Sequence, residues 1–572
     1  MNRLRRALPF LTWPRPDAAL MRGELMAGLT VGLMIIPQGV AYAALAGMPL
    51  VTGIYASLLP ALVAVLFGAS PRLSVGPTAL TCLLVGASLA PLATAGSPEW
   101  VMLAAWLALL CGALQVLLGL VRFGWLLNLV NSPVLMAFTQ AAALLIVASQ
   151  LPPLLGATGW PDLFADLQAG GSVGAWHAPS VAFGLGSLAL LWLARRWRPT
   201  FPVVLLVVVA SAGISRFSGF EASGGAVVGT LPEGLPAPVW PGWPGWQLLG
   251  QLVLPVLVIT LVSFLETASS AQVDNAGRNT RWDQDQDLIG QGLAKLVAGI
   301  SGAFPTSSSF SRSALNLYAG ARTGWATLVS VAVVALALLL FMPVLHHVPR
   351  AVLAAIVLVA IVGLIRPAAF VRLWRLSRVE ALIAGATLLV TLAAAPALYW
   401  GVLAGVLMSL SHFLYLRLHP RIIEVGLHPD GSLRDRHLWQ LPPLAPGLYA
   451  LRMDAALDFA TATGFERAVA EHLDAHPDTR HVMWIAHPVN WTDATGAEAF
   501  GRLRRTLAQR GITLHLVGIK LPVEQLLQRA GHLDDTAGLR TYRTEAEALQ
   551  ALPGLHGPGA DQSQRASASL GT

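Results

Sequence analysis

Long stretches without Asp, Glu, Lys or Arg run through this chain, and they constrain its fold more than any other feature. One stretch covers residues 25–71, and others cover 325–345, 351–365 and 381–416. A helix needs roughly 20 apolar residues to cross a bilayer, so each stretch can hold one or two membrane helices. Only 12% of the 572 residues are charged, which is about half the share in an average soluble domain. The sequence therefore predicts a polytopic α-helical membrane protein.

The apolar segments and their breakers predict about fourteen crossings in a transmembrane domain of residues 23–420. They form two sets of seven, over residues 23–217 and 246–418, and an odd number of crossings makes the two sets inverted repeats. The ninth and tenth segments are weak by hydropathy because they contain Lys295 and Arg312. The predicted centres lie near Leu33, Leu59, Leu83, Leu109, Leu145, Leu188, Val207, Leu257, Ala294, Leu315, Val334, Ile356, Leu389 and Val406.

The placement of basic residues predicts the orientation in the membrane. If residues 1–22 form a cytoplasmic N-terminal segment, fourteen crossings put most loop arginines on the same side, as the positive-inside rule requires. The opposite loops carry few basic residues, and the main exception is the group His346, His347 and Arg350. We therefore expect a multi-pass protein of the cell inner membrane with both termini in the cytoplasm. Residues 553–572 are rich in Gly, Ser, Ala and Gln and are expected to form a disordered tail.

The composition after the last apolar segment indicates a small soluble α/β domain, expected over residues 436–552. Thr463 and Glu466 have the spacing of a capping box at a helix start, and Asp493 can cap a second helix. Thr495 in this second turn is a candidate phosphate acceptor, although an ordinary helix start explains the same pattern. The strand candidates are Leu448–Met453, His481–Ala486 and Ile512–Val517, which are short and apolar.

The sequence lacks the motifs of common enzymes and cofactor-binding proteins. It contains no Walker loop, no zinc-binding helix motif and no dinucleotide fingerprint. Cys82 and Cys111 lie in apolar runs and give neither a disulfide framework nor metal-ligand spacing. The net charge is +7, but the basic residues punctuate apolar segments instead of forming one face, which argues against nucleic-acid binding. We therefore expect no enzyme, no metal and no cofactor.

Two segments, one in each half, open with Gly, Pro and hydroxyl residues. The first reads Leu73-Ser-Val-Gly-Pro-Thr-Ala79, and the second spans residues 301–313. Interrupted helices at matching positions of two repeats mark the binding site of many transporters. Pro77 and Thr78, and the stretch from Thr306, would place two helix N-termini inside the membrane, where unpaired N–H groups and the helix dipole favour an anion. Two ordinary helices that start with Pro are the alternative.

Polar residues are costly inside a membrane and therefore suggest function. Gln38 and Tyr42 are four residues apart and share one helix face, where they can bind a ligand or hold neighbouring helices together. Arg312 keeps its charge and needs an anion or a carboxylate; it could also pair with Glu266 or reach the cytoplasmic surface. Glu266, with Ser270 one turn later, could take up a proton or bind sodium and so couple transport to a gradient. A structural carboxylate is the alternative reading of Glu266.

These residues lie in motifs that resemble the sulfate permease (SulP) family of anion transporters and exchangers. The soluble domain resembles the family's cytoplasmic STAS domain, with Asp493-Ala-Thr-Gly496 at its signature turn. The membrane motifs are Ala27-Gly-Leu-Thr-Val31, Pro37-Gln-Gly-Val-Ala-Tyr-Ala43, Leu73-Ser-Val-Gly-Pro77, Ser309-Phe-Ser-Arg-Ser-Ala-Leu-Asn316 and Gly320-Ala-Arg-Thr323.

The resemblance implies a core domain and a gate domain, usually in a homodimer, with an anion site between the third and tenth helices. It assigns Glu266 to the position associated with cation coupling. Some similar bacterial members have an acid where Gln38 stands, and Ala494 with Thr495 replaces a serine pair of related regulators. The substrate-site residues that it implies are Gln38, Tyr42, Pro77, Thr78, Phe310, Ser311 and Arg312.

We therefore expect secondary transport of a small anion, such as sulfate, bicarbonate, chloride or a small dicarboxylate, by elevator-like alternating access. Oriented amides and one Arg suit any of these anions, so the sequence does not choose among them. Coupling to H⁺ or Na⁺ and a cytoplasmic protein partner of the STAS domain are further expectations. The two alternatives are a nucleobase-type permease of the same fold and a membrane-anchored STAS signalling module that does not transport.

Overall fold

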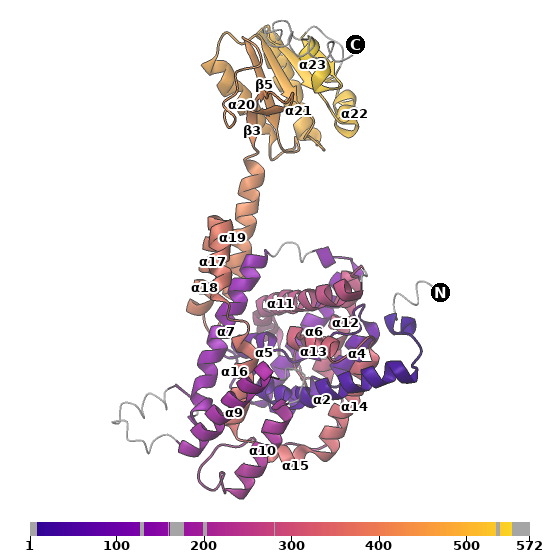
Figure 1. Cartoon of the computed structure of the whole chain (residues 1–572), viewed down its shortest axis with the longest axis vertical. Helices are drawn as coiled ribbons and strands as arrows, with labels where there is room; N and C mark the ends of the chain where they lie inside the picture. Colours follow the sequence, from indigo (N-terminus) through magenta and orange to yellow (C-terminus); the bar gives the residue numbers. More distant parts are fainter. Residues whose placement is uncertain are drawn as a thin grey trace, which may run out of the picture. The chain divides into compact units, whose positions relative to one another are not determined.

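The computed structural model describes residues 8–125, 131–157, 159–160, 177–197, 203–278, 281–533 and 538–551. The chain divides into two compact units, Met1–Ser409 and Leu410–Thr572. The first unit is almost entirely helical and the second contains a sheet (Figure 1). The predicted tail of residues 553–572 and the first seven residues lie outside the described ranges.

Helices form wherever the sequence predicts an apolar segment, and each of the fourteen predicted centres falls within one of them. Six helices of the described ranges are long and apolar enough to cross a membrane, and five shorter apolar helices have 10–17 residues. The number of crossings therefore stays a prediction. The helices of the first unit are α2 (Ala18–Leu45), α3 (Thr52–Tyr55), α4 (Leu59–Phe67), α5 (Ala79–Leu89), α6 (Pro98–Leu120), α7 (Ser132–Leu154), α9 (Ala178–Trp197), α10 (Val203–Phe217), α11 (Trp246–Arg278), α12 (Gln284–Ile300), α13 (Phe310–Tyr318), α14 (Trp325–Leu340), α15 (Met342–His346), α16 (Arg350–Val362), α17 (Pro367–Leu376) and α18 (Arg378–Ala393), after the short 3₁₀ turn η1 (Pro9–Thr12). The last helix, α19 (Tyr399–Leu418), begins in the first unit and ends in the second.

The helices of the first unit pack in pairs that join the two halves of the chain. α12 packs against α6 and α4, α14 against α2, and α16 against α7 and α9. Small residues allow the close approach of α2 and α14, because a Cβ at Gly28 would lie 2.5 Å from the Ala326 carbonyl oxygen. The buried Glu24 carboxylate of α2 accepts hydrogen bonds from the backbone N–H groups of Arg322, Thr323 and Ala326. This carboxylate therefore caps the start of α14 from another helix.

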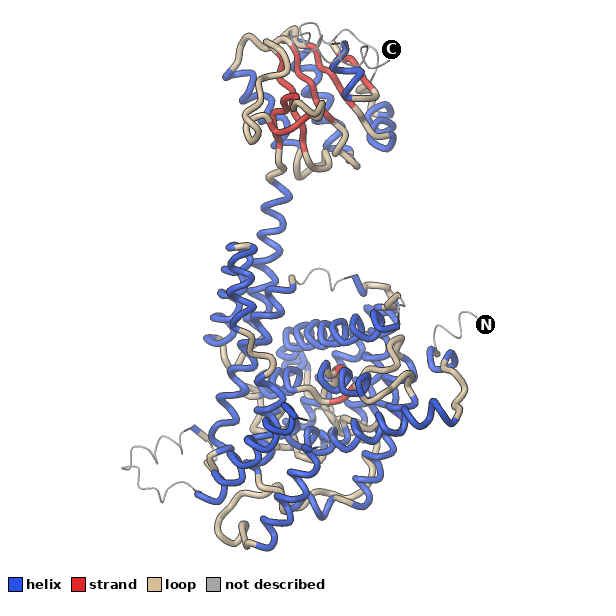
Figure 2. The backbone as a smooth tube through the Cα atoms, viewed as in Figure 1, coloured by secondary structure: helices blue, strands red, loops and turns tan. Residues whose placement is uncertain are grey.

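Two short strands lie inside the helical unit (Figure 2). β1 (Val75–Gly76) pairs antiparallel with β2 (Ser307–Ser308), and the Ser309 N–H also donates to the Ser74 carbonyl at 2.9 Å. β1 leads into α5 and β2 leads into α13. Because the strands run in opposite directions, the chain enters these two helices in opposite senses, as inverted repeats require. The strand pair thus brings the two interrupted segments together.

The second unit is built on a six-stranded sheet in the order β4-β3-β5-β6-β7-β8. The last four strands pair in parallel, and β3 and β4 are antiparallel additions. Side chains of alternating strand positions enter two separate apolar clusters, one on each face. The strands are β3 (Ile422–Leu427), β4 (Leu433–Asp435), β5 (Leu448–Met453), β6 (His481–Ile485), β7 (Thr513–Val517) and β8 (Leu539–Tyr542), and the helices are α20 (Ala462–Ala475), α21 (Ala494–Gln509), α22 (Leu521–Arg529) and α23 (Glu545–Ala551).

The three predicted strands are present as β5, β6 and β7. Of the two predicted helix caps, one is confirmed and one is wrong. Asp493 caps α21, because its Oδ1 accepts from the Gly496 N–H at 2.8 Å. The predicted capping box at Thr463 is wrong, because α20 already begins at Ala462 and its N-cap, Thr461, makes no capping hydrogen bond. The sheet also begins earlier than the predicted domain start at residue 436, because β3 and β4 precede it. β4 has only three residues, and two of them are charged, so it carries little sequence signal.

Candidate functional site

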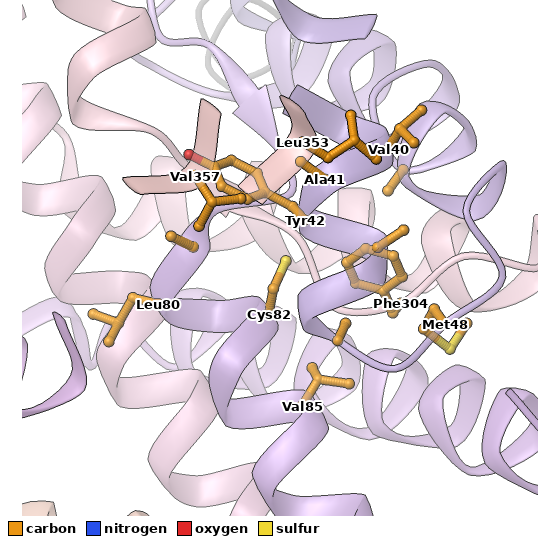
Figure 3. Packing of buried hydrophobic residues seen from close by; sticks show 14 of the residues in the cluster. Val40, Ala41, Tyr42, Met48, Leu80, Cys82, Val85, Phe304, Leu353 and Val357 are labelled. Carbon is orange, nitrogen blue, oxygen red and sulfur yellow. The ribbon is translucent and has the colours of Figure 1, made fainter. Parts of the chain in front are cut away.

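A cavity of about 380 Å³ opens beside the paired strands, where the starts of α5 and α13 meet α7, α11 and α16. The first wall consists of Tyr42, Thr78, Ala79, Leu80, Ser309, Phe310 and Ser311, and Glu266 and Ser269 of α11 join it. The second wall includes Ser132, Thr139 and Gln140 of α7, Ile361 of α16, and Arg366. Tyr42 and Leu80 also belong to the largest apolar cluster, together with Cys82 and Val357 (Figure 3). Apolar side chains therefore make up most of the lining, and polar groups such as those of Thr78, Glu266 and Gln140 lie among them.

Both interrupted helices present their N-termini to this cavity. Thr78 is the N-cap of α5 and its Oγ1 accepts from the Thr81 N–H at 3.3 Å. Ser309 is the N-cap of α13, which settles where that helix begins, and its Oγ accepts from the Arg312 N–H at 3.4 Å. The first N–H groups of a helix have no partner within it, and the dipole gives this end a partial positive charge. The residues that follow each cap line the cavity, so these N–H groups are available to an anion.

Glu266 places a carboxylate at the same cavity. Its Oε2 accepts hydrogen bonds from the hydroxyls of Thr78 at 3.0 Å and Thr81 at 3.1 Å. The Ser270 hydroxyl instead donates to the main-chain carbonyl of Glu266 at 3.0 Å, so the structure pairs the carboxylate with α5 and not with Ser270. The carboxylate of Glu266 is therefore in direct contact with the N-cap residue of α5.

Arg312 lies behind the cavity and not in its wall. The side chain is 1% exposed; its Nη1 donates to the Pro77 carbonyl at 2.9 Å and its Nε to Ser74 Oγ at 3.3 Å. Its Nη2 has no hydrogen-bond partner among the described residues, and no ion pair with Glu266 is formed within them. The guanidinium therefore ties the start of α13 to Pro77, the residue before the N-cap of α5, and its charge adds to that of the two helix N-termini.

Two other predicted residues are near the site without lining the cavity. Gln38 is 3% exposed, and its Oε1 has no hydrogen-bond partner within the described ranges. Pro77 is buried and contributes its carbonyl to Arg312. The structure therefore brings Tyr42, Thr78, Phe310, Ser311 and Glu266 together around the opening, whereas the side chains of Gln38, Pro77, Arg312 and Ser270 support it from behind.

Gln140 and Arg366, on the second wall, were not found by sequence reasoning. The backbone N–H of Arg366 donates to Gln140 Oε1 at 3.0 Å, and Gln140 Nε2, a buried donor, has no partner in the described part of the chain. Arg366 belongs to a basic stretch that the positive-inside rule already explains, so the sequence gives no separate reason to place Arg366 at the cavity. A glutamine within an apolar segment is the one available signal, and it is the same signal that identified Gln38.

A buried lysine in α12 also escaped assignment to the site. Lys295 is fully buried, and its Nζ donates to Gln115 Oε1 at 2.9 Å. Gln115 in turn donates to Ser263 Oγ at 2.9 Å, and the Ser307 hydroxyl donates to the Ser263 carbonyl at 3.1 Å. Polar contacts therefore run from Lys295 to β2, and the lysine adds another positive charge behind the two helix starts.

Comparisons with known proteins identify the family of the chain. The model of the sulfate permease family matches residues 21–387, and the model of the STAS domain matches residues 443–548. The chain is 33% identical to a probable sulfate transporter of Mycobacterium tuberculosis (strain CDC 1551 / Oshkosh) over 538 residues, which are 93% of this chain and 95% of the relative. The chain therefore belongs to the sulfate permease family and carries a C-terminal STAS domain.

Solved structures show the same fold. The murine solute carrier 26 family member A9 anion transporter, in its inward-facing state, has a TM-score of 0.86 at 21% identity, over 96% of this chain and 95% of its own. The transmembrane domain of the cyanobacterium bicarbonate transporter BicA has a TM-score of 0.59 at 21% identity, over 68% of this chain and 98% of its own. The family and its relatives are transporters and not enzymes. The match to the sulfate permease family and to the STAS domain sets the nucleobase-permease alternative aside.

Proposed function

We propose that this membrane protein carries a small anion by secondary transport and binds it in the cavity at the starts of α5 and α13. The observation that carries the proposal is the meeting of these two helix N-termini, capped by Thr78 and Ser309, at one largely apolar cavity. Backbone N–H groups and helix dipoles replace the water around an anion without a fixed cation in contact with it. The relatives named for sulfate and for bicarbonate support a substrate of this class.

Coupling to a cation follows from the position of Glu266. An ionised carboxylate in the wall of the cavity repels the anion that the helix N-termini attract. Protonation of Glu266, or Na⁺ bound at its carboxylate, removes this repulsion, so the anion and the cation bind together. The hydroxyls of Thr78 and Thr81, which contact Glu266, link the two binding events.

Alternating access is the mode of transport that suits the two walls. One wall comes from α5, α11 and α13, and the other from α7 and α16. We propose that the first wall moves with the anion past the second, in the manner of an elevator, across the cell inner membrane with both termini in the cytoplasm. A homodimer and a cytoplasmic partner of the STAS domain remain proposals that rest on the family.

The test is uptake of labelled sulfate, bicarbonate and fumarate into proteoliposomes that contain the purified protein. We expect uptake of at least one of these anions under a proton or sodium gradient. Thr78→Val removes the cap of α5 and a contact of Glu266 with little change in shape, and it should impair uptake. Thr391→Val is the matched control, because Thr391 is also buried and its hydroxyl bonds only to its own helix. If no anion moves under any gradient, the alternative of a non-transporting signalling module replaces this proposal.

A further inference from the structure

A cluster of three metal-binding side chains lies away from the cavity, at the ends of α10 and α15. Glu221 follows α10, and His346 and His347 lie at the end of α15. One donor atom of each residue lies within 4.8 Å of the other two. His346 Nε2 is 3.6 Å from Glu221 Oε2, and the two imidazole rings are 4.7 Å apart between centroids. The anion site uses none of these residues.

The backbone on both sides of the cluster is held in place by hydrogen bonds. The Val228 N–H donates to the Val348 carbonyl at 2.9 Å, and the Gly229 N–H donates to the His346 carbonyl at 3.1 Å. The Arg350 N–H donates to the Ala226 carbonyl at 2.9 Å. The segment after Glu221 is therefore attached along its length to the segment that carries the histidines. Because the backbone that carries the three ligands is already held in place, little backbone conformational entropy is lost when a metal binds.

The turn that carries Glu221 is also fixed. Phe220 is 1% exposed and packs edge-on against Phe183 at 5.0 Å between ring centroids. The Gly224 N–H donates to the Glu221 carbonyl at 3.1 Å, and the Gly225 N–H donates to the Phe220 carbonyl at 3.0 Å. The Glu221 side chain itself is 56% exposed, against 26% for His346. A solvated ion can therefore reach the three donors.

We propose that Glu221, His346 and His347 form a binding site for a divalent transition metal such as Zn²⁺. Two imidazoles and one carboxylate suit Zn²⁺, Cu²⁺ or Ni²⁺, whereas Mg²⁺ and Ca²⁺ prefer oxygen ligands only. Donors about 2.1 Å from a tetrahedral Zn²⁺ lie about 3.4 Å from one another. The distance from His346 to Glu221 is close to this value, and side-chain rotations can bring His347 in. Three protein ligands leave one position of the metal for water.

The orientation that we propose for the chain places this site on the side of the membrane opposite the cytoplasm. The only part of the inference that rests on the proposed function is this placement, because the ligand geometry is independent of transport. The site would thus respond to metal ions outside the cytoplasm. It also joins the segment after α10 to the link between α14 and α16.

Isothermal titration of the purified full-length protein with Zn²⁺, after removal of any affinity tag, tests the proposal. We expect one Zn²⁺ per chain and visible absorption bands of a four-coordinate site when Co²⁺ is used instead. Glu221→Gln, His346→Asn and His347→Asn should each weaken binding by about 10-fold or more, since loss of an outer-shell partner alone costs 10–100-fold. His412→Asn, a histidine of α19 far along the chain, is the control and should bind as the original protein does.

Two results would overturn the site. The first is the absence of saturable Zn²⁺ binding by the original protein, which would leave His346 and Glu221 as an ion pair only. The second is unchanged binding by the double variant His346→Asn/His347→Asn, which would place the metal elsewhere. Uptake measured on the same preparation reports on the transport proposal separately, so the two proposals can fail independently.

Discussion

The Glu266 carboxylate shares a cavity with the anion that we propose, so Glu266→Gln should remove the dependence of anion binding on protons or sodium. The substitution keeps the shape of the side chain. Its amide oxygen can still accept the hydrogen bonds that the hydroxyls of Thr78 and Thr81 donate to Oε2. What is lost is the negative charge and, with it, the site for a proton or a cation.

The size of the effect follows from the dimensions of the cavity. A sphere of 380 Å³ has a radius of about 4.5 Å, which approximates the distance from a central anion to the wall. At an effective dielectric constant of about 20 to 40, two like charges at this distance repel by about 2–4 kcal/mol. Because about 1.36 kcal/mol is tenfold in affinity, ionised Glu266 should weaken anion binding by about 30- to 900-fold.

The assay measures the half-saturation concentration for labelled anion uptake into proteoliposomes, at acidic and alkaline external pH and with or without Na⁺. In the original protein this concentration should rise by about 30- to 900-fold when neither protons nor sodium neutralise Glu266. The Glu266→Gln variant should give one value under all conditions. Glu99→Gln, an exposed acid at the start of α6, is the matched control. A variant that keeps the full gradient dependence would refute the coupling role.

Three further predictions concern other buried ionisable groups. Arg312→Ala removes one charge and the hydrogen bonds to Pro77 and Ser74, so the half-saturation concentration for anion uptake should rise by about 10-fold or more. Arg372→Ala on α17 is the control and should leave the uptake kinetics unchanged. Unchanged kinetics in Arg312→Ala would exclude a role of Arg312 in anion binding. Glu24→Ala leaves several N–H groups at the start of α14 unpaired and should lower the free energy of unfolding by about 3 kcal/mol. Thermal unfolding should then show a lower Tm, and an unaltered Tm would contradict this prediction. Burial, aided by His481 and Arg540, lowers the pKa of His515 to about 4, below about 6.5 in the unfolded chain. The free energy of unfolding of the STAS unit should therefore fall by about 1–3 kcal/mol as the pH falls from 6.5 towards 4. In the His515→Asn variant this decrease should be smaller when unfolding is measured at several pH values. An equally steep decrease in the variant would refute the prediction.

Short-range patterns of the sequence were sufficient for the apolar helices, for three of the six strands of the second unit and for the class of protein. Apolar runs of about 20 residues placed the helices because the bilayer imposes that length wherever a chain crosses it. Pro77 and the hydroxyl residues after Pro305 predicted two interrupted helices, since a helix start needs caps and tolerates Pro. Asp493 predicted the start of α21 for the same local reason, and family motifs supplied the rest of the classification.

Tertiary structure decided which polar groups face the cavity. Arg312 is polar like Thr78, yet it does not line the cavity, because the pairing of β1 with β2 determines how α5 and α13 approach each other. The pairing of Glu266 with Thr78 and Thr81 depends on helices that are far apart in the chain.

The second wall of the cavity likewise depends on tertiary packing. The sequence contains Gln140 and Arg366, but only the packing of α7 against α16 brings them to the opening. Sequence thus determined where helices begin and which residues are costly to bury, because these are local properties of the chain in its solvent. The fold determined which of these residues meet, because that depends on contacts between residues separated by more than a hundred positions.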